Sequence, residues 1–193
     1  MLHKSDIIIA LHKELSLQPK VLIVTDPVMY AKSGDLLLEK RALEHLKKYI
    51  LTISKVITPN LYEAQHLAEI TITTQDDMLK AAEKIFLYGA KYVIVKGGHL
   101  KNDCYDLLYE TESKQTWWLK NNKIATKNLH GTCCTFSAAL AANIAYGASI
   151  IEATQAAKEY ITQAIFHGAQ YEIGHGSGPV HHFYNMWKKN GNK

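Results

Sequence analysis

The sequence is poor in cysteine: only three of its 193 residues are cysteines, and no pair has the Cys-x-x-Cys spacing. Cys133 and Cys134 are neighbours, and adjacent cysteines rarely bridge each other, so we expect reduced thiols in a cytoplasmic protein. Neither further ligands nor a resolving partner lies at a usable spacing from this pair. This argues against a redox or metal protein built on the two cysteines.

Long apolar runs, signal-peptide features and basic stripes with interleaved aromatic residues are also missing from the sequence. We therefore expect neither a membrane span nor nucleic-acid binding. The chain has 22 basic and 18 acidic residues, a net charge of +4 and a pI near 8.8. With 47% hydrophobic and 21% charged residues, its composition is typical of a soluble globular protein.

No repeat, low-complexity tract or linker divides the chain, so we expect residues 1–193 to form a single domain. Strands alternate with helices, which predicts an α/β fold with a mostly parallel sheet covered on both faces. Strands are predicted over 21–25, 55–58, 92–96, 104–109 and 115–119, the last two as a hairpin, and helices over 5–15, 39–50, 62–69, 75–88, 135–146 and 150–166. We expect Ser5 to cap the first helix, and Ser149 with Glu152 to form a capping box at the last.

Polar residues stand at the carboxyl ends of three predicted strands. Asp26, Asn60 and Lys96 occupy these places, and in parallel sheets ligands bind beyond such strand ends. We expect all three to face the same side as the turn over residues 131–134. This convergence is the strongest indication of a binding site that the residue pattern offers by itself.

Each of these positions has a structural and a functional interpretation. Asp26 precedes Pro27, a common way to begin a turn, but a carboxylate at a sheet edge can also hold Mg²⁺. Asn60 followed by Glu63 has the spacing of a helix capping box. The same pair could orient a hydrated magnesium ion beside a nucleotide's phosphates, and the two roles are compatible.

Lys96 is followed by two glycines, Gly97 and Gly98. A lysine charge suits phosphate, and glycine allows the backbone to approach a ligand closely. A plain strand-to-loop turn explains the two glycines equally well. The sequence leaves these two alternatives open.

The segment over residues 131–134 leads into a helix rich in small residues. Free N–H groups at a helix start attract anions, whereas Thr132 could simply serve as the N-cap. Helix starts lower the pKa of thiols, so Cys134 could act as a general base toward an alcohol. The alternative for Cys134, and also for Cys133, is a buried structural cysteine.

Histidine is frequent, with ten copies, and His175, His181 and His182 crowd the C-terminal segment. Adjacent histidines seldom ligate one metal ion, and no acidic partner stands nearby at regular spacing. We therefore do not expect a zinc site.

The chain resembles the hydroxymethylpyrimidine/phosphomethylpyrimidine kinases of thiamine biosynthesis, within the ribokinase-like superfamily. The most specific similarity is the run Asp-Pro-Val-Met-x-x-Lys-Ser-Gly that begins at Asp26. Further similar stretches follow in the family's order and cover nearly the whole chain, at residues 57–64, 95–100, 130–140 and 174–180.

The resemblance implies a three-layer αβα fold and ATP-dependent phosphorylation of the pyrimidine's hydroxymethyl group and then of its phosphate, with Mg²⁺. It implies that Cys134 is the catalytic base. The remaining implied roles are an anion hole at Gly131, Thr132 and Cys133, metal and phosphate positions at Asp26, Glu63 and Asn60, nucleotide contacts at Lys96 and Gly98, and pyrimidine contacts at Val28 and Met1.

Two departures from the family pattern stand out. The family's turn reads Gly-Thr-Gly-Cys, whereas Cys133 replaces the second glycine here. A side chain there is costly if the position needs a positive φ or close phosphate approach, and losing one anion-hole donor typically lowers the rate by about 10²- to 10³-fold.

The second departure is that the N-terminal strands of the family have no counterpart, which predicts an exposed apolar sheet edge. A homodimer or a complementing N-terminal fragment could cover that edge. A catalytically inactive remnant that keeps only nucleotide binding is the alternative to a kinase.

Overall fold

The computed structural model describes residues 2–30, 37–98 and 104–187. The chain forms two compact units, Met1–Lys120 and Asn121–Lys193. The single domain that the sequence predicts over residues 1–193 stays a prediction.

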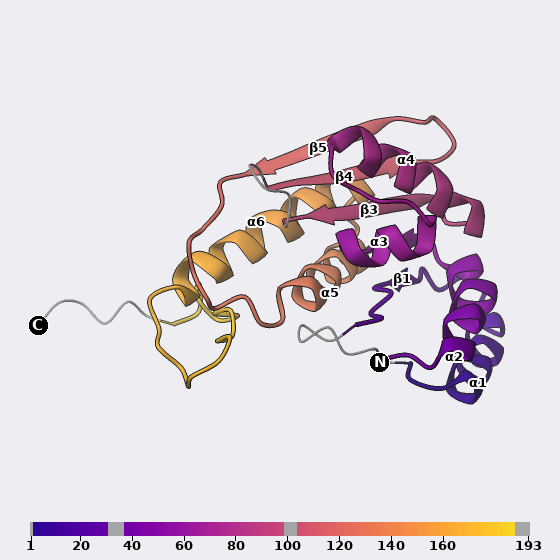
Figure 1. The fold of residues 1–193 in the computed structure, drawn as a ribbon, viewed down its shortest axis with the longest axis horizontal. Coiled ribbons are helices and arrows are strands. Elements are labelled where there is room, and N and C mark those ends of the chain that lie inside the picture. The colour runs from indigo at the N-terminus through magenta and orange to yellow at the C-terminus, as the bar shows by residue number, and fades with distance from the viewer. Residues whose placement is uncertain (1, 31–36, 99–103, 188–193) are drawn as a thin grey trace, which may run out of the picture. The chain divides into compact units, whose positions relative to one another are not determined.

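A five-stranded sheet is the centre of the first unit (Figure 1). Its strands lie in sequence order: β1 (Val24–Thr25), β2 (Val56–Ile57), β3 (Tyr92–Gly97), β4 (Cys104–Glu110) and β5 (Thr116–Asn121). β1 pairs with β2, and β2 with β3, in parallel, whereas β4 runs antiparallel to β3. Residues 92–95 of β3 form a continuous apolar run, as expected of a strand whose residues are almost all buried.

The helices of the first unit are α1 (Ser5–Ser16), α2 (Lys40–His45), α3 (Leu61–Ala68) and α4 (Gln75–Ile85). α2 continues into a π-helical turn, Leu46–Ile50, and a 3₁₀ turn, Leu51–Ile53, and α4 ends in a 3₁₀ turn, Phe86–Tyr88. α3 and α4 pack against β3. Met78, Ala81 and Ile85 of α4 belong to the same buried cluster as Val93 and Val95 of β3.

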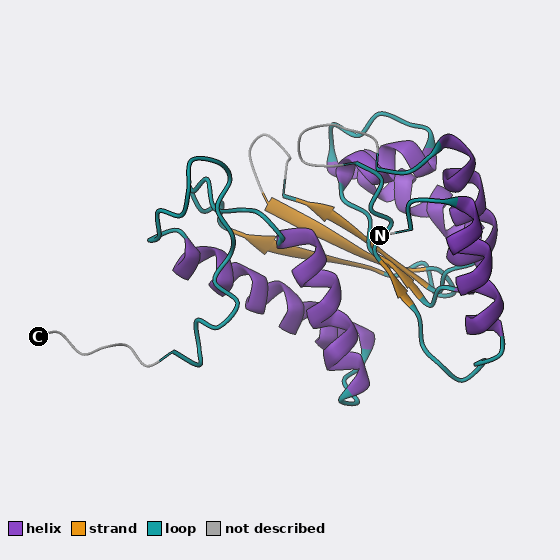
Figure 2. Ribbon diagram, turned by 90° about the horizontal axis from the view of Figure 1, so that it is seen from below, coloured by secondary structure: helices purple, strands orange, loops and turns teal. Residues whose placement is uncertain are grey.

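Two helices, α5 (Thr132–Ala145) and α6 (Ile150–Gly168), pack along each other in the second unit (Figure 2). Gly147, with φ of 95°, reverses the chain between them. A capping box of Ser149 and Glu152 then begins α6, as the sequence predicts. Their buried surfaces include Leu140 and Ala157.

Most predicted elements are present, but four details differ. The predicted strand over 21–25 is reduced to two residues, since Val21 and Leu22 are 53% and 41% exposed. Lys96 lies within β3 and not after it. Ser5 does not cap α1, because Lys4 is the N-cap and makes no side-chain cap bond. α5 begins three residues earlier than the predicted start at residue 135. No helix in the described ranges is long and apolar enough to cross a membrane.

Candidate active site

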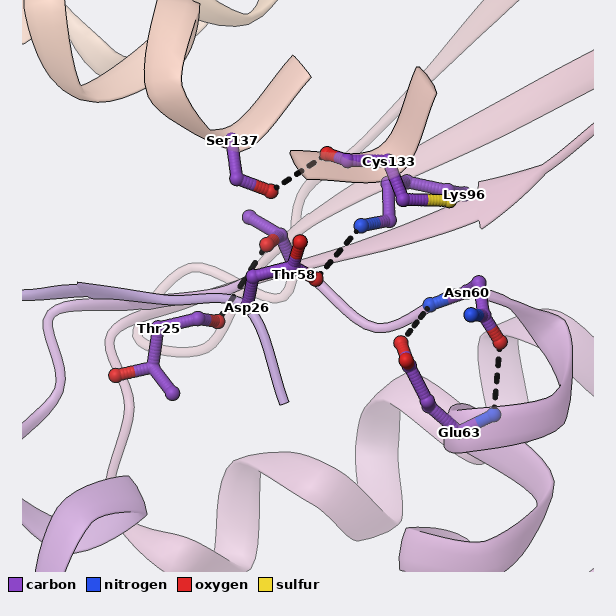
Figure 3. Close-up of polar contacts among 8 residues, drawn as sticks. All are labelled: Thr25, Asp26, Thr58, Asn60, Glu63, Lys96, Cys133 and Ser137. Atoms are coloured by element: carbon purple, nitrogen blue, oxygen red, sulfur yellow. Dashed lines mark hydrogen bonds and ion pairs between the residues drawn. The ribbon is translucent and has the colours of Figure 1, made fainter. Parts of the chain in front are cut away.

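Three predicted site residues meet at the carboxyl edge of the parallel strands. The register pairs Thr25 with Ile57 and Ile57 with Val93, so β1 and β2 end side by side. β3 continues beyond them to Gly97. Asp26 follows β1 directly, and Asn60 forms an isolated parallel bridge with Lys96. The expected convergence of these three residues is therefore confirmed within the first unit (Figure 3).

Lys96 and Asp26 form a buried ion pair. Lys96 Nζ donates to Asp26 Oδ1 at 2.8 Å, and the two side chains are only 8% and 13% exposed. Asp26 Oδ2 is also buried, and it has no hydrogen-bond partner among the described residues. A buried oxygen without a hydrogen-bond partner in the protein usually binds a water molecule or a cation. The carboxylate therefore fits a magnesium ligand, since Mg²⁺ prefers one or two carboxylates plus water and phosphate oxygens.

The capping box predicted at Asn60 and Glu63 is confirmed. Asn60 N donates to Glu63 Oε2 at 2.8 Å, and Glu63 N donates to Asn60 Oδ1 at 2.9 Å (Figure 3). Glu63 is 3% exposed, and burial raises its pKa to about 7, although Lys96 and the Asn60 amide act in the opposite direction. A nearby cation would favour the charged carboxylate, so the cap and a metal role remain compatible.

Residues outside the predicted site hold the strand ends in place. Thr25 Oγ1 and Ser54 Oγ lie 2.7 Å apart, and Ser54 Oγ donates to Ile50 O at 2.7 Å. Gly97 N donates to the buried Asp106 Oδ1 at 2.8 Å. The signal for Asp106 was present, because an acidic residue in a buried apolar strand needs a partner.

The residues after Asp26 form a tight turn. Val28 N donates to Asp26 O at 2.9 Å, and Val28 is half-buried. This hydrogen bond folds the backbone at Val28 back toward Asp26. The run that begins at Asp26 continues into residues 31–36, which lie outside the described residues. Met1 lies outside them too.

In the second unit, the start of α5 differs from the expected Thr132 cap. Gly131, with φ of +85°, is the N-cap, and it has no side chain with which to cap the helix. Thr132 is not the N-cap, since its Oγ1 donates back to Leu129 O at 2.8 Å. By contrast, α3, α4 and α6 all begin with capping boxes.

The two cysteines lie in the first turn of α5. Cys133 is half-buried, and its carbonyl oxygen accepts from Ser137 Oγ at 3.1 Å (Figure 3). Cys134 is exposed, so the buried-cysteine alternative is wrong for it. The only non-glycine residues with positive φ in the described ranges are Glu69 and Lys114. Cys133 therefore suffers no backbone strain, and only close phosphate approach remains as a reason for glycine there.

A pocket of about 260 Å³ also lies in the second unit, where α6 ends and the C-terminal segment follows. It is mainly aromatic, and its lining includes Tyr171, His181, Phe183 and Trp187. The sequence pattern does not indicate this pocket, because residues that are scattered along the C-terminal segment form it only after folding.

Comparison with known proteins identifies the family. A family model described as phosphomethylpyrimidine kinase matches residues 1–181. The chain belongs to the phosphomethylpyrimidine kinase family. It is 45% identical over 167 residues to a hydroxymethylpyrimidine/phosphomethylpyrimidine kinase of Rhizobium meliloti, covering 86% of this chain and 62% of that protein. A Staphylococcus aureus protein of the same description is 42% identical over 173 residues, covering 86% and 60%. The chain thus spans about three fifths of the length of these phosphomethylpyrimidine kinases.

Solved structures confirm the ribokinase-like α/β fold. A Bacillus subtilis pyridoxal kinase in complex with ADP matches with a TM-score of 0.84 and 37% identity, over 96% of this chain and 68% of that one. A Staphylococcus aureus pyridoxal kinase in complex with AMP-PCP and pyridoxal gives 0.86 and 34%, over 96% and 66%. A phosphomethylpyrimidine kinase of Clostridium difficile gives 0.74 and 35%, over 86% and 66%.

Proposed function

We propose that this protein transfers the γ-phosphate of ATP to hydroxymethylpyrimidine and to its monophosphate. Membership of the phosphomethylpyrimidine kinase family supports the reaction class. The observation that carries the proposal is the buried Lys96–Asp26 pair, whose second carboxylate oxygen is unpartnered among the described residues. It combines the two charges that phosphoryl transfer requires, a cation for phosphate and a carboxylate for Mg²⁺.

In the proposed site, Asp26 and Glu63 hold Mg²⁺, which neutralises charge on the phosphate oxygens when bound. Lys96 faces the phosphates as a point charge, with Asn60 and Gly98 supplying further nucleotide contacts. Val28 lines the pyrimidine site, as the family resemblance also implies for Met1. These roles require little covalent chemistry from the protein, because phosphoryl transfer depends on positioning and charge stabilisation.

The proposed acid–base group lies at the start of α5. Cys134 is exposed in the first turn of α5 and would accept the proton of the attacking hydroxyl group. Gly131, Thr132 and Cys133 form the proposed anion hole, at a helix start where the N-cap contributes no side chain. The partial positive charge of a helix N-terminus favours both a thiolate and a phosphate oxygen.

Pyridoxal is a second candidate acceptor. The pyridoxal kinases of Bacillus subtilis and Staphylococcus aureus have TM-scores of 0.84 and 0.86, higher than the 0.74 of the Clostridium difficile phosphomethylpyrimidine kinase. The two acceptors share a planar nitrogen heterocycle with a hydroxymethyl group. A single assay can therefore compare them directly.

The test is phosphate transfer from ATP and Mg²⁺ to each acceptor, with Cys134→Ser as the matched variant. We expect transfer to the pyrimidine by the unchanged chain and its loss in Cys134→Ser, while ATP binding measured by calorimetry stays nearly the same. If the protein phosphorylates pyridoxal and not the pyrimidine, pyridoxal replaces the pyrimidine as the proposed substrate. Equal activity in Cys134→Ser would remove the base assignment. ATP binding without transfer to either acceptor would favour the nucleotide-binding remnant.

A further inference from the structure

One C-terminal segment holds the chain on both sides of the turn over residues 131–134. Before the turn, His130 N donates to Gly178 O at 3.0 Å, and His130 forms a parallel bridge with Pro179. After the turn, Thr135 Oγ1 and His182 Nε2 lie 3.0 Å apart. Residues 178–182 thus contact the positions immediately before Gly131 and immediately after Cys134.

This segment is itself anchored to α6. His181 N donates to Ala164 O at 2.9 Å, and Tyr160 Oη donates to the carbonyl oxygen of His182 at 2.8 Å. Val180, between the two contacts with the turn, is 4% exposed. Because the backbone of His182 is fixed from α6, its imidazole can fix the position of Thr135.

The residues that precede the turn are also fixed through α6. Asn128 Nδ2 donates to Gly168 O and to Tyr171 O, each at 2.7 Å, and Asn128 is 1% exposed. Gly178 packs so closely that an added Cβ would lie 2.1 Å from Asn128 Oδ1. The approach to the turn is therefore rigid, and the Thr135–His182 contact is exposed. On the far side of the turn, this contact joins Thr135 to the C-terminal segment through the two side chains.

We propose that His182 is a positioning residue that acts through Thr135 to orient the first turn of α5, which carries Cys134. The inference rests on the proposed function, because it assigns a purpose to a fixed Cys134. A misplacement of about 1 Å can lower a rate by roughly 100-fold even when the altered residue touches no reactant. His182 would thus influence the chemical step and leave ligand affinity largely unchanged.

The first test measures phosphate transfer in three variants. His182→Ala and Thr135→Val each remove the contact, and we expect each to lower kcat about five- to tenfold, the effect of one lost hydrogen bond. The KM for ATP should change less than about twofold, because only transition-state interactions are lost. His182→Gln, which keeps a side-chain donor and acceptor, should recover most of the rate. His175→Ala, at an exposed histidine that precedes residues 178–182, is the control and should leave kcat unchanged.

Two outcomes would overturn the proposal. One is a kcat for His182→Ala equal to that of the unchanged protein. The other is a double variant, His182→Ala with Thr135→Val, whose losses simply multiply, since partners in one contact must show coupling.

A second measurement separates this proposal from the proposed function. Backbone amide NMR shifts of residues 131–135 report the geometry of the turn without any activity. We expect shifts in these amides for His182→Ala and Thr135→Val, and much smaller ones for His182→Gln. If the unchanged protein transfers no phosphate, the proposed function fails, while these shifts still decide the role of His182. Unmoved amides in a folded His182→Ala protein would refute the positioning role.

Discussion

Glu63 combines a confirmed structural role with a proposed functional one in a single side chain. Its carboxylate accepts a hydrogen bond from the Asn60 amide and caps α3. It is also buried close enough to Asp26 and Lys96 that both charges shift its pKa. Burial raises its pKa from the usual 4.5 to about 7. Between pH 4.5 and about 7, the folded protein without bound metal therefore keeps a proton at Glu63 that the unfolded chain has released.

This proton makes stability depend on pH in a definite direction. Below pH 4.5 Glu63 is protonated in both states, whereas between 4.5 and about 7 only the folded state keeps the proton. The free energy of unfolding should therefore fall as pH rises through this window, by on the order of 3 kcal/mol. Glu63→Gln keeps the cap but cannot ionise, so it should lack this decrease.

The measurement is denaturant unfolding of both proteins at pH 5 and pH 8 without divalent cations. The difference in stability between Glu63→Gln and the unchanged protein should be larger at pH 8 than at pH 5. A pH-independent difference would show that Glu63 ionises normally in the folded protein.

At the scale of elements, β3 carries the site because its end is closely packed. Lys96 is held by Asp26, and the next residue, Gly97, faces the neighbouring strand β4. A Cβ on Gly97 would lie 1.9 Å from the carbonyl oxygen of Tyr105 and 2.9 Å from the end of Met78. The glycine is thus required by close approach between two backbones, whereas Gly98 has open space around its Cα.

Gly97→Ala should therefore be strongly destabilising, by about 2–4 kcal/mol, because backbone cannot move aside as a flexible side chain can. Gly98→Ala is the matched control and should change stability by less than about 1 kcal/mol. Thermal or urea unfolding of the two variants checks both values. Similar stabilities for the two variants would mean that β4 can shift to accommodate the methyl group.

Helix starts show where local sequence signals succeed and where they fail. The boxes at Asn60/Glu63 and Ser149/Glu152 were predictable, because both partners of a capping box lie within four residues. The start of α5 was not, since Thr132 has the right residue type but donates to Leu129 O instead. A side chain with two local partners within reach cannot be assigned from sequence spacing alone.

At the scale of the whole molecule, ligand binding should raise stability by mass action. At a nucleotide concentration 100 times its Kd, binding adds about 2.7 kcal/mol, which corresponds to a rise in Tm of roughly 5–10 °C. We expect ATP with Mg²⁺ to raise the Tm of the unchanged chain, and the pyrimidine together with ATP and Mg²⁺ to raise it further. Scanning calorimetry with each ligand alone and with both checks this.

Asp26→Asn provides the control for the metal role. The substitution preserves the shape of the side chain but weakens its attraction for a divalent cation. The rise in Tm caused by ATP with Mg²⁺ should therefore shrink in this variant. An unchanged rise would place the metal elsewhere and contradict the assignment of Asp26.

The sequence by itself determined the α/β class, the family and the convergence of Asp26, Asn60 and Lys96, because these depend on local periodicity and on the rule that parallel strands end at one edge. Only the tertiary structure decided that Lys96 forms an ion pair with Asp26, that burial raises the pKa of Glu63, and that residues 178–182 hold both sides of the turn. These features either join residues that are 47 to 70 positions apart or depend on desolvation, and local spacing along the sequence encodes neither.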